Sequence, residues 1–179
     1  MTLILVNNNS DSIEFYADKI SSYGSEVIMN KTKKIHDSEH VIIGTAGVAD
    51  STFDEVLSNF DWEEQNSLSE FKLYILEQYD SDVISPGSYS VILYVKPLDV
   101  LLHIDLDTNY ICEATKTVSV FCQINVVHDQ FLSIGSGSHY AKFATELGIT
   151  DPTKIFEATH KVLPNIGTEY HTIGYNKKG

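Results

Sequence analysis

Several features that would place this chain in a common functional class are missing from its sequence. No apolar run approaches the roughly 20 residues of a membrane-spanning helix, and the N-terminus lacks a basic stretch followed by an apolar one. Basic residues are scarce, because 12 lysines and arginines stand against 25 acidic residues, for a net charge of -13. Binding to the phosphates of nucleic acid requires a basic surface on the protein. We therefore expect a cytoplasmic protein that binds neither membranes nor nucleic acid.

Cysteine is also rare. Cys112 and Cys122 both lie in apolar, strand-like segments, where buried free thiols are favoured over a disulfide across a hairpin. The seven histidines are scattered without metal-ligand spacing, so no metal or other cofactor is expected. A phosphate-loop lysine motif is missing, which disfavours nucleotide binding. The 179 residues, 42% of them hydrophobic, suffice for one domain over residues 1–179 with a sizeable core.

The N-terminal part of the chain has the period of β-strands. Residues 2–6 are apolar and a polar turn follows at 7–11, after which Ile13, Phe15 and Ala17 alternate with polar residues. These segments predict a first β-hairpin. Further short strands are predicted at residues 27–29, 33–36 and 40–43.

Two helices are predicted next. Asp50 or Ser51 can cap the first of them, whose apolar positions follow the 3.6-residue period: Phe53, Val56, Leu57 and Phe60. Residues 67–70 read Ser-Leu-Ser-Glu, a capping-box pattern that begins the second helix. Its apolar positions are Phe71, Tyr74, Ile75 and Tyr79.

The rest of the chain repeats this order of strands followed by helices. Strands are predicted at residues 91–95, 101–106, 110–113, 118–127 and 131–134, with Asp107-Thr108-Asn109 as a hairpin turn. A glycine-rich turn at residues 135–138 leads into a third helix, with one apolar face formed by Tyr140, Phe143, Ala144 and Leu147. Asp151-Pro152 begins a fourth helix that ends before Pro164, and a last strand covers residues 168–175.

Helices grouped in this way do not suggest a parallel sheet of alternating strands and helices. They predict an α+β fold of two packed antiparallel sheets with a helical pair outside each, a four-layer αββα sandwich.

Thr2 directly follows Met1, and this position has chemical consequences. A small second residue normally allows methionine aminopeptidase to remove Met1, which leaves Thr2 with a free α-amine titrating near pH ~8. Thr2 would then hold a hydroxyl nucleophile and a weak base in one residue. Asp18 and Lys34 follow at spacings that let two hairpin strands return them to the start of the chain.

Thr2 and four further stretches together carry a family resemblance: residues 16–18 (Tyr-Ala-Asp), 30–35 (Asn-Lys-Thr-Lys-Lys-Ile), 43–50 (Ile-Gly-Thr-Ala-Gly-Val-Ala-Asp) and 132–138 (Leu-Ser-Ile-Gly-Ser-Gly-Ser). In their order and spacing they are similar to the proteasome β-subunit and HslV peptidase type of N-terminal nucleophile (Ntn) hydrolase. The resemblance covers nearly the whole chain. It implies the Ntn hydrolase fold and a threonine-type endopeptidase.

The same resemblance assigns roles to single residues. It implies a catalytic set of Thr2, Asp18, Lys34 and Ser136, and an oxyanion-binding N–H at Gly44. A primary specificity pocket is implied at Ser21, Thr32, Ile42 and Ala46. The substrates would be peptides or unfolded proteins, cleaved inside a homo-oligomeric ring or stacked rings, with an ATP-dependent unfoldase ring as a partner.

The residues taken singly leave other interpretations open. Asp18 can cap a turn, Lys34 can be a solvated charge, and the turn at residues 135–138 can open a helix or bind an anion. The loop at residues 160–168 lacks the aspartate that family members usually carry, and Asn165 is its only polar substitute. The alternative function is a catalytically inert homologue that serves as a structural or assembly subunit, for example one encoded by a phage or a mobile element.

Overall fold

The computed structural model of this chain describes residues 2–23, 26–29, 33–47, 51–62, 67–80, 87–112 and 117–177. Contacts divide the chain into two compact units. The first unit comprises Met1–Asp37, Gly44–Ala46 and His128–Gly179, and the second comprises Ser38–Ile43 and Gly47–Val127. One domain over residues 1–179 stays a prediction. Within the described ranges, no helix has the length and apolar character needed to cross a membrane.

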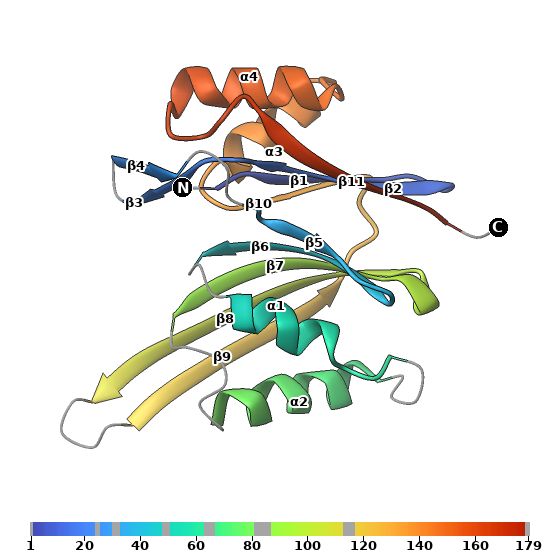
Figure 1. Cartoon of the computed structure of the whole chain (residues 1–179), viewed down its shortest axis with the longest axis vertical. Coiled ribbons are helices and arrows are strands. Elements are labelled where there is room, and N and C mark those ends of the chain that lie inside the picture. Colours follow the sequence, from blue (N-terminus) through green and yellow to red (C-terminus); the bar gives the residue numbers. More distant parts are fainter. Residues whose placement is uncertain are drawn as a thin grey trace. The chain divides into compact units, whose positions relative to one another are not determined.

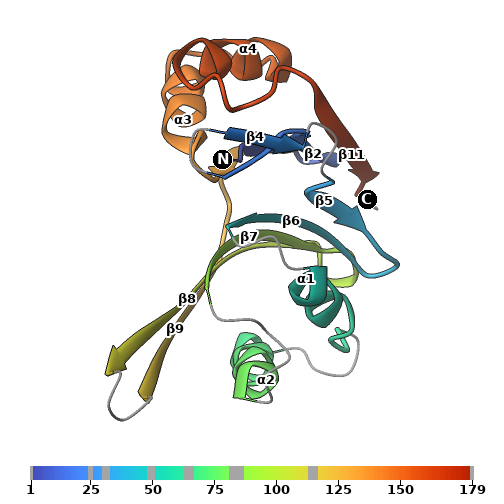
Figure 2. The same ribbon diagram turned by 60° about the vertical axis from the view of Figure 1, so that its left-hand side comes forward.

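The first unit contains an antiparallel sheet with the strand order β10-β1-β2-β11. Its strands are β1 (Ile4–Asn8), β2 (Ser12–Asp18), β10 (Phe131–Ile134) and β11 (Tyr170–Asn176). Figures 1 and 2 show α3 (Ser138–Glu146) and α4 (Pro152–Val162) on one face of this sheet. The core between them consists of Leu3, Leu5, Ala141, Ala144, Ile155, Phe156 and Ile166. The unit also contains the hairpin of β3 (Ser21–Tyr23) and β4 (Glu26–Met29).

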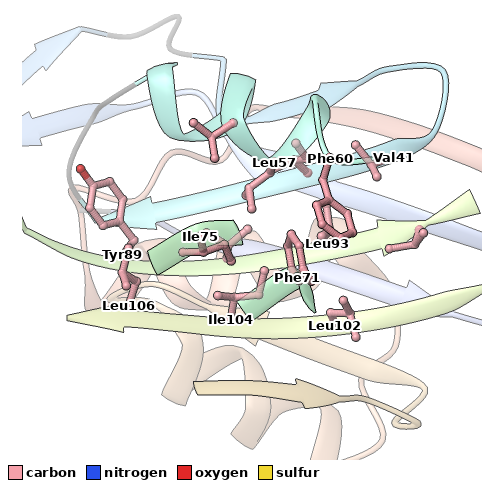
Figure 3. Packing of buried hydrophobic residues seen from close by; sticks show 14 of the residues in the cluster. Val41, Leu57, Phe60, Phe71, Ile75, Tyr89, Leu93, Leu102, Ile104 and Leu106 are labelled. Carbon is pink, nitrogen blue, oxygen red and sulfur yellow. The ribbon is translucent and has the colours of Figure 1, made fainter. Parts of the chain in front are cut away.

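A second sheet has the strand order β5-β6-β7-β8-β9. Its strands are β5 (Ile35–Asp37), β6 (Val41–Gly47), β7 (Ser88–Val95), β8 (Val100–Cys112) and β9 (Thr117–Val126), with a short 3-10 helix at Lys96–Leu98 between β7 and β8. In the second unit, α1 (Ser51–Ser58) and α2 (Leu68–Asp80) lie on one face of this sheet (Figure 2). Figure 3 shows how Phe71 and Ile75 of α2 pack with Leu93 and Ile104 of the strands.

Two of the three helix starts predicted from capping patterns are confirmed by their hydrogen bonds, and the third, at Asp50 or Ser51, lies partly outside the described residues. Ser67 Oγ accepts a hydrogen bond from the Glu70 N–H at 3.1 Å, and the Glu70 carboxylate accepts from the Ser67 N–H at 3.3 Å. At the start of α4, the Asp151 carboxylate accepts from the Thr153 N–H at 2.9 Å, with Pro152 at the first helical position. These bonds satisfy backbone donors that have no partner within the helix. The predicted α+β class, with antiparallel sheets and two pairs of helices, is also confirmed.

The predicted hairpin turn at Asp107-Thr108-Asn109 is wrong. These residues lie within β8, where they pair with Phe121, Val120 and Ser119 of β9. Backbone pairing along this long ladder outweighs the local turn preference of polar residues, and Asp107 accepts a hydrogen bond from Ser88 Oγ of β7 at 2.9 Å. The predicted strands at 101–106 and 110–113 are therefore one strand, and the reversal between β8 and β9 lies outside the described residues.

The predicted apolar face of the third helix is wrong except at Ala144. Tyr140, Phe143 and Leu147 are 41%, 61% and 65% exposed, whereas Ala141 and Ala144 are buried. The small alanine side chains allow α3 to approach β1, β10 and α4 closely, and so they form the packed face. Larger side chains at these two positions would hold the helix away.

Candidate active site

Thr2 lies two residues before the start of β1 and contacts the glycine-rich turn that follows β10. Its N–H donates to Ser136 Oγ at 3.1 Å, and its carbonyl oxygen accepts from the Gly137 N–H at 3.2 Å and from Ser136 Oγ at 3.4 Å. The antiparallel pairing of β1 with β10, which sets Ile4 opposite Ile134, brings these distant segments together. Because Met1 precedes Thr2, the nitrogen here is an amide, and it marks the place of the α-amine that removal of Met1 would create.

Gly135 brings the turn against Thr2. Its φ of +88° lies in the left-handed region, which glycine adopts without strain. A Cβ atom at this position would lie 2.3 Å from the Thr2 carbonyl oxygen and 3.2 Å from the Thr2 Cβ. No side chain fits in this space, so the close approach of the turn to Thr2 requires a glycine.

Asp18, at the end of β2, is fully buried and has a partner for each carboxylate oxygen. Oδ1 accepts from the Leu3 N–H at 2.8 Å and from Lys34 Nζ at 2.8 Å. Oδ2 accepts from the N–H of Ile20 at 3.3 Å and of Gly167 at 3.4 Å. A buried carboxylate with charge-assisted hydrogen bonds of this kind is fixed in orientation.

Lys34 lies immediately before β5 and is 7% exposed. Its Nζ donates to Asp18 and also to the carbonyl oxygen of Ile20. Burial lowers the pKa of Lys34 below the usual 10.5, and the negative charge of Asp18 raises it in part. The Lys34 carbonyl oxygen accepts from the Thr45 N–H of β6 at 3.1 Å, which fixes the backbone at this position.

The contacts of Thr2 with the Ser136 turn and the contacts of Asp18 with Lys34 meet at the peptide between Thr2 and Leu3. The nitrogen of this peptide, Leu3 N, donates to Asp18, and its carbonyl carbon belongs to Thr2, which contacts the Ser136 turn. The Asp18 N–H also donates to the Leu3 carbonyl oxygen at 3.1 Å. A buried ion pair and a serine hydroxyl therefore both lie beside the residue that would become the chain start.

Solved structures with the same fold are known. HslV from Trypanosoma brucei superposes with a TM-score of 0.67 at 19% identity, over 98% of this chain and 99% of that one. BPH from Thiobacillus denitrificans, in complex with epoxomicin and also in a second structure, superposes with a TM-score of 0.63 at 15% identity. That match covers 99% of this chain and 99% or more of BPH. This chain has the HslV fold. The predicted Ntn hydrolase fold of the proteasome β and HslV type is thus confirmed. No protein-family model and no curated protein matches the sequence itself.

Of the residues predicted for catalysis in this Ntn hydrolase fold, Thr2, Asp18, Lys34 and Ser136 all lie in the first unit. The structure brings Thr2 to Ser136 and Asp18 to Lys34 through direct hydrogen bonds, and joins the two pairs through the Leu3 N–H. None of the described side chains forms a cluster of three or more His, Cys, Asp or Glu residues placed to hold a metal ion.

Gly44 lies within β6, one residue before Thr45. A Cβ at Gly44 would lie 3.0 Å from Ile4 Cγ2 and 3.4 Å from Ile35 Cγ2, so its Cα packs on apolar side chains. This close packing is by itself a structural reason for a glycine at position 44. Its role as an oxyanion donor stays a prediction.

The residues predicted to line a specificity pocket are only partly described. Thr32 lies outside the described residues, and for Ser21 only the backbone, in β3, is described. Ile42 and Ala46 of β6 are 0% and 4% exposed. Buried side chains offer little surface to a substrate, so the pocket assignment stays a prediction.

Three backbone donors of the site were not predicted from the sequence. The N–H groups of Leu3, Ile20 and Gly167 each bond to Asp18. Any residue except proline supplies such a donor, so no side-chain signal marks these positions. Only the glycine at position 167 gives a weak sequence signal, because a glycine can mark a place of close packing. In the structure a Cβ there would lie 3.0 Å from Ile20 Cγ1.

Proposed function

We propose that this chain is a threonine-type endopeptidase whose nucleophile is Thr2 after removal of Met1. The observation that carries the proposal is the double attachment of the N-terminal segment. The Thr2 nitrogen bonds to Ser136 Oγ, and the next nitrogen bonds to the buried Asp18–Lys34 pair. The fold of HslV supports the same assignment.

The reaction begins with removal of Met1, which converts the Thr2 amide into an α-amine. The neutral amine takes the proton of the Thr2 hydroxyl, and the oxygen attacks the carbonyl carbon of the substrate peptide bond. The tetrahedral intermediate breaks its C–N bond, and the ammonium returns the proton to the leaving amine. Water then hydrolyses the Thr2 ester, which releases the acid product and restores the hydroxyl.

Lys34 and Asp18 act on this reaction as a pair. The positive charge of Lys34 favours ionisation of the Thr2 hydroxyl, and Lys34 is held close to the start of the chain because its Nζ and the Leu3 N–H donate to the same oxygen of Asp18. Asp18 keeps Lys34 in place and charged, because an unpaired charge at this burial is unfavourable. Ser136 holds the α-amine through the contact that its Oγ makes with the Thr2 nitrogen.

Two measurements on protein from the native cell test the proposal. Intact mass is expected to show that Met1 is absent. Incubation with epoxomicin, the compound that BPH binds in its complex, is expected to add one inhibitor mass at Thr2. Retained Met1 without labelling would instead indicate an inert homologue.

Gly135 provides a test of the geometry around Thr2. Gly135→Ala is expected to lower the labelling rate about 100-fold, because its Cβ must displace the Thr2 carbonyl by a large part of an ångström. Gly148→Ala is the matched control. Gly148 has a similar φ of +82°, but nothing lies within 4 Å of its added Cβ. Both substitutions carry about 1–2 kcal/mol of backbone strain, so equal labelling rates in the two variants would contradict the proposed geometry.

We also propose that copies of this chain assemble into a homo-oligomer that takes peptides or unfolded proteins as substrates. Tyr140, Phe143 and Leu147 of α3 are exposed at i, i+3 and i+7 and form an apolar stripe. Such a stripe is typical of an interface. The adjacent Lys142 and Glu146 have opposite charges, which allows two antiparallel copies of α3 to pair favourably on a chain that is otherwise strongly acidic. An ATP-dependent unfoldase ring as a further partner stays a prediction.

Phe143→Glu is expected to shift this assembly toward the 20.0 kDa monomer in size-exclusion chromatography with light scattering. The reason is that a charge in an apolar contact is poorly solvated. Leu73→Glu is the control, since Leu73 on α2 is 59% exposed, close to the 61% of Phe143. If both variants keep the native mass, α3 is not the interface.

A further inference from the structure

His160, in the last turn of α4, makes one short hydrogen bond to the loop that leads to β11. Its Nδ1 lies 2.7 Å from the carbonyl oxygen of Ile166. Since a carbonyl oxygen only accepts, Nδ1 carries the hydrogen and donates it. The loop is closed further by the Leu163 N–H on Thr159 and by the Ile166 N–H on Leu163, at 2.8 Å and 2.9 Å.

The loop reaches Asp18 through Gly167. The Gly167 N–H, directly after the Ile166 carbonyl, donates to Asp18 Oδ2 at 3.4 Å in a buried environment. The peptide between Ile166 and Gly167 therefore accepts from His160 at its oxygen and donates to Asp18 at its nitrogen. A shift of this peptide changes the orientation of the carboxylate that holds Lys34.

The loop also reaches the Ser136 turn, through the Ile166 side chain. Ile166 is fully buried, and a Cβ on Gly137 would lie 3.5 Å from Ile166 Cγ1 and 3.1 Å from Thr159 Cγ2. Gly137 in turn donates its N–H to the Thr2 carbonyl. Ile166 thus lies behind the turn that contacts Thr2.

We propose that His160 is the positioning residue of this site. Its bond to Ile166 fixes one loop that orients both the Asp18 carboxylate and the turn against Thr2. The anchor of the loop is thus a histidine of the preceding helix. The inference rests on the proposed peptidase function and adds a residue to it.

Three variants separate this role from a general contribution to stability. His160→Ala removes the donor, whereas His160→Asn keeps an N–H group near the place of Nδ1. Lys161→Ala is the matched control, because Lys161 is an exposed neighbour in the same helical turn. Each is compared with the native protein in epoxomicin labelling over a range of inhibitor concentrations.

His160→Ala is expected to lower the maximal labelling rate about 10- to 100-fold, because the reacting groups lose alignment. The inhibitor concentration for half-maximal rate should change little. The Asn and Lys161→Ala variants are expected to stay within about threefold of native, since the anchoring bond persists in both. A native maximal rate in His160→Ala overturns the inference. If His160→Ala does not fold, His160→Gln, which displaces the donor by one methylene, takes its place with the same expectation.

Deuterium exchange provides a readout that does not depend on activity. His160→Ala is expected to speed exchange of the Gly167 amide, and His160→Asn and Lys161→Ala are not. If the native protein lacks Met1 and still fails to label, the peptidase proposal fails, and exchange alone decides the role of His160. Unchanged exchange at Gly167 in His160→Ala then overturns the inference.

Discussion

Thr2→Ala is expected to lower peptide hydrolysis at least about 1,000-fold, because it removes the only oxygen proposed to attack the substrate. Thr2→Ser keeps a hydroxyl and is expected to retain measurable turnover. Alanine and serine are both small, so Met1 removal should proceed in both variants, and intact mass checks this. The measurement is the rate of release of a fluorophore from peptide amides.

The control for this comparison is a measurement of whether Thr2→Ala still folds like the native protein. Thr2 is only partly buried, and its contacts to Ser136 and Gly137 use backbone atoms that alanine retains. The melting temperature followed by circular dichroism should therefore change little. Full hydrolysis by Thr2→Ala would show that another group is the nucleophile, and the peptidase mechanism would then have to be abandoned while the fold stays unaffected.

The sequence predicted elements well where local chemistry decides them. Strand β10 has the predicted limits, Phe131 and Ile134, and α4 begins at the predicted proline after an aspartate cap. Both depend on nearby residues alone. The site followed partly from the same logic, since the end of a hairpin strand places Asp18 beside the chain start.

Local chemistry was a poor guide where tertiary packing decides the outcome. In α3 the larger residues suggested a buried face, but Ala141 and Ala144 are buried because they permit close contact with α4 and the sheet. At Asp107, pairing with β9 overrode a turn preference. The Gly167 and His160 contacts have the same origin, because they connect residues through a loop whose path only the folded chain defines.

Asp18→Asn is expected to destabilise the protein by about 3–5 kcal/mol, since it leaves the buried Lys34 charge without its counter-ion. Chemical denaturation measures the free energy of unfolding. The matched control is the double variant Asp18→Asn with Lys34→Met, in which neither member of the pair carries a charge. It should regain much of the stability but not the activity. A single variant as stable as the native protein would show that the pair is not buried in solution.

The same substitution should change the pH dependence of labelling. Burial lowers the pKa of Lys34 and the Asp18 charge raises it, so Asp18→Asn lowers the pKa of Lys34 further. If Lys34 acts as a cation, the alkaline decline in labelling rate lies below pH 10.5 in the native protein and moves to lower pH in Asp18→Asn.

The stability contribution of Lys34 has a definite sign with pH. Between its lowered pKa and the usual 10.5, the folded state binds fewer protons than the unfolded state, so this contribution increases with pH across that window. In Asp18→Asn the pKa of Lys34 is lower still, so the stability of this variant begins to increase at a lower pH than that of the native protein. The difference in the free energy of unfolding between the two proteins should therefore shrink as the pH rises between the two pKa values. A deficit that is constant with pH would mean that the charge of Asp18 does not raise the pKa of Lys34, and the proposed action of the two charges as a pair would be wrong.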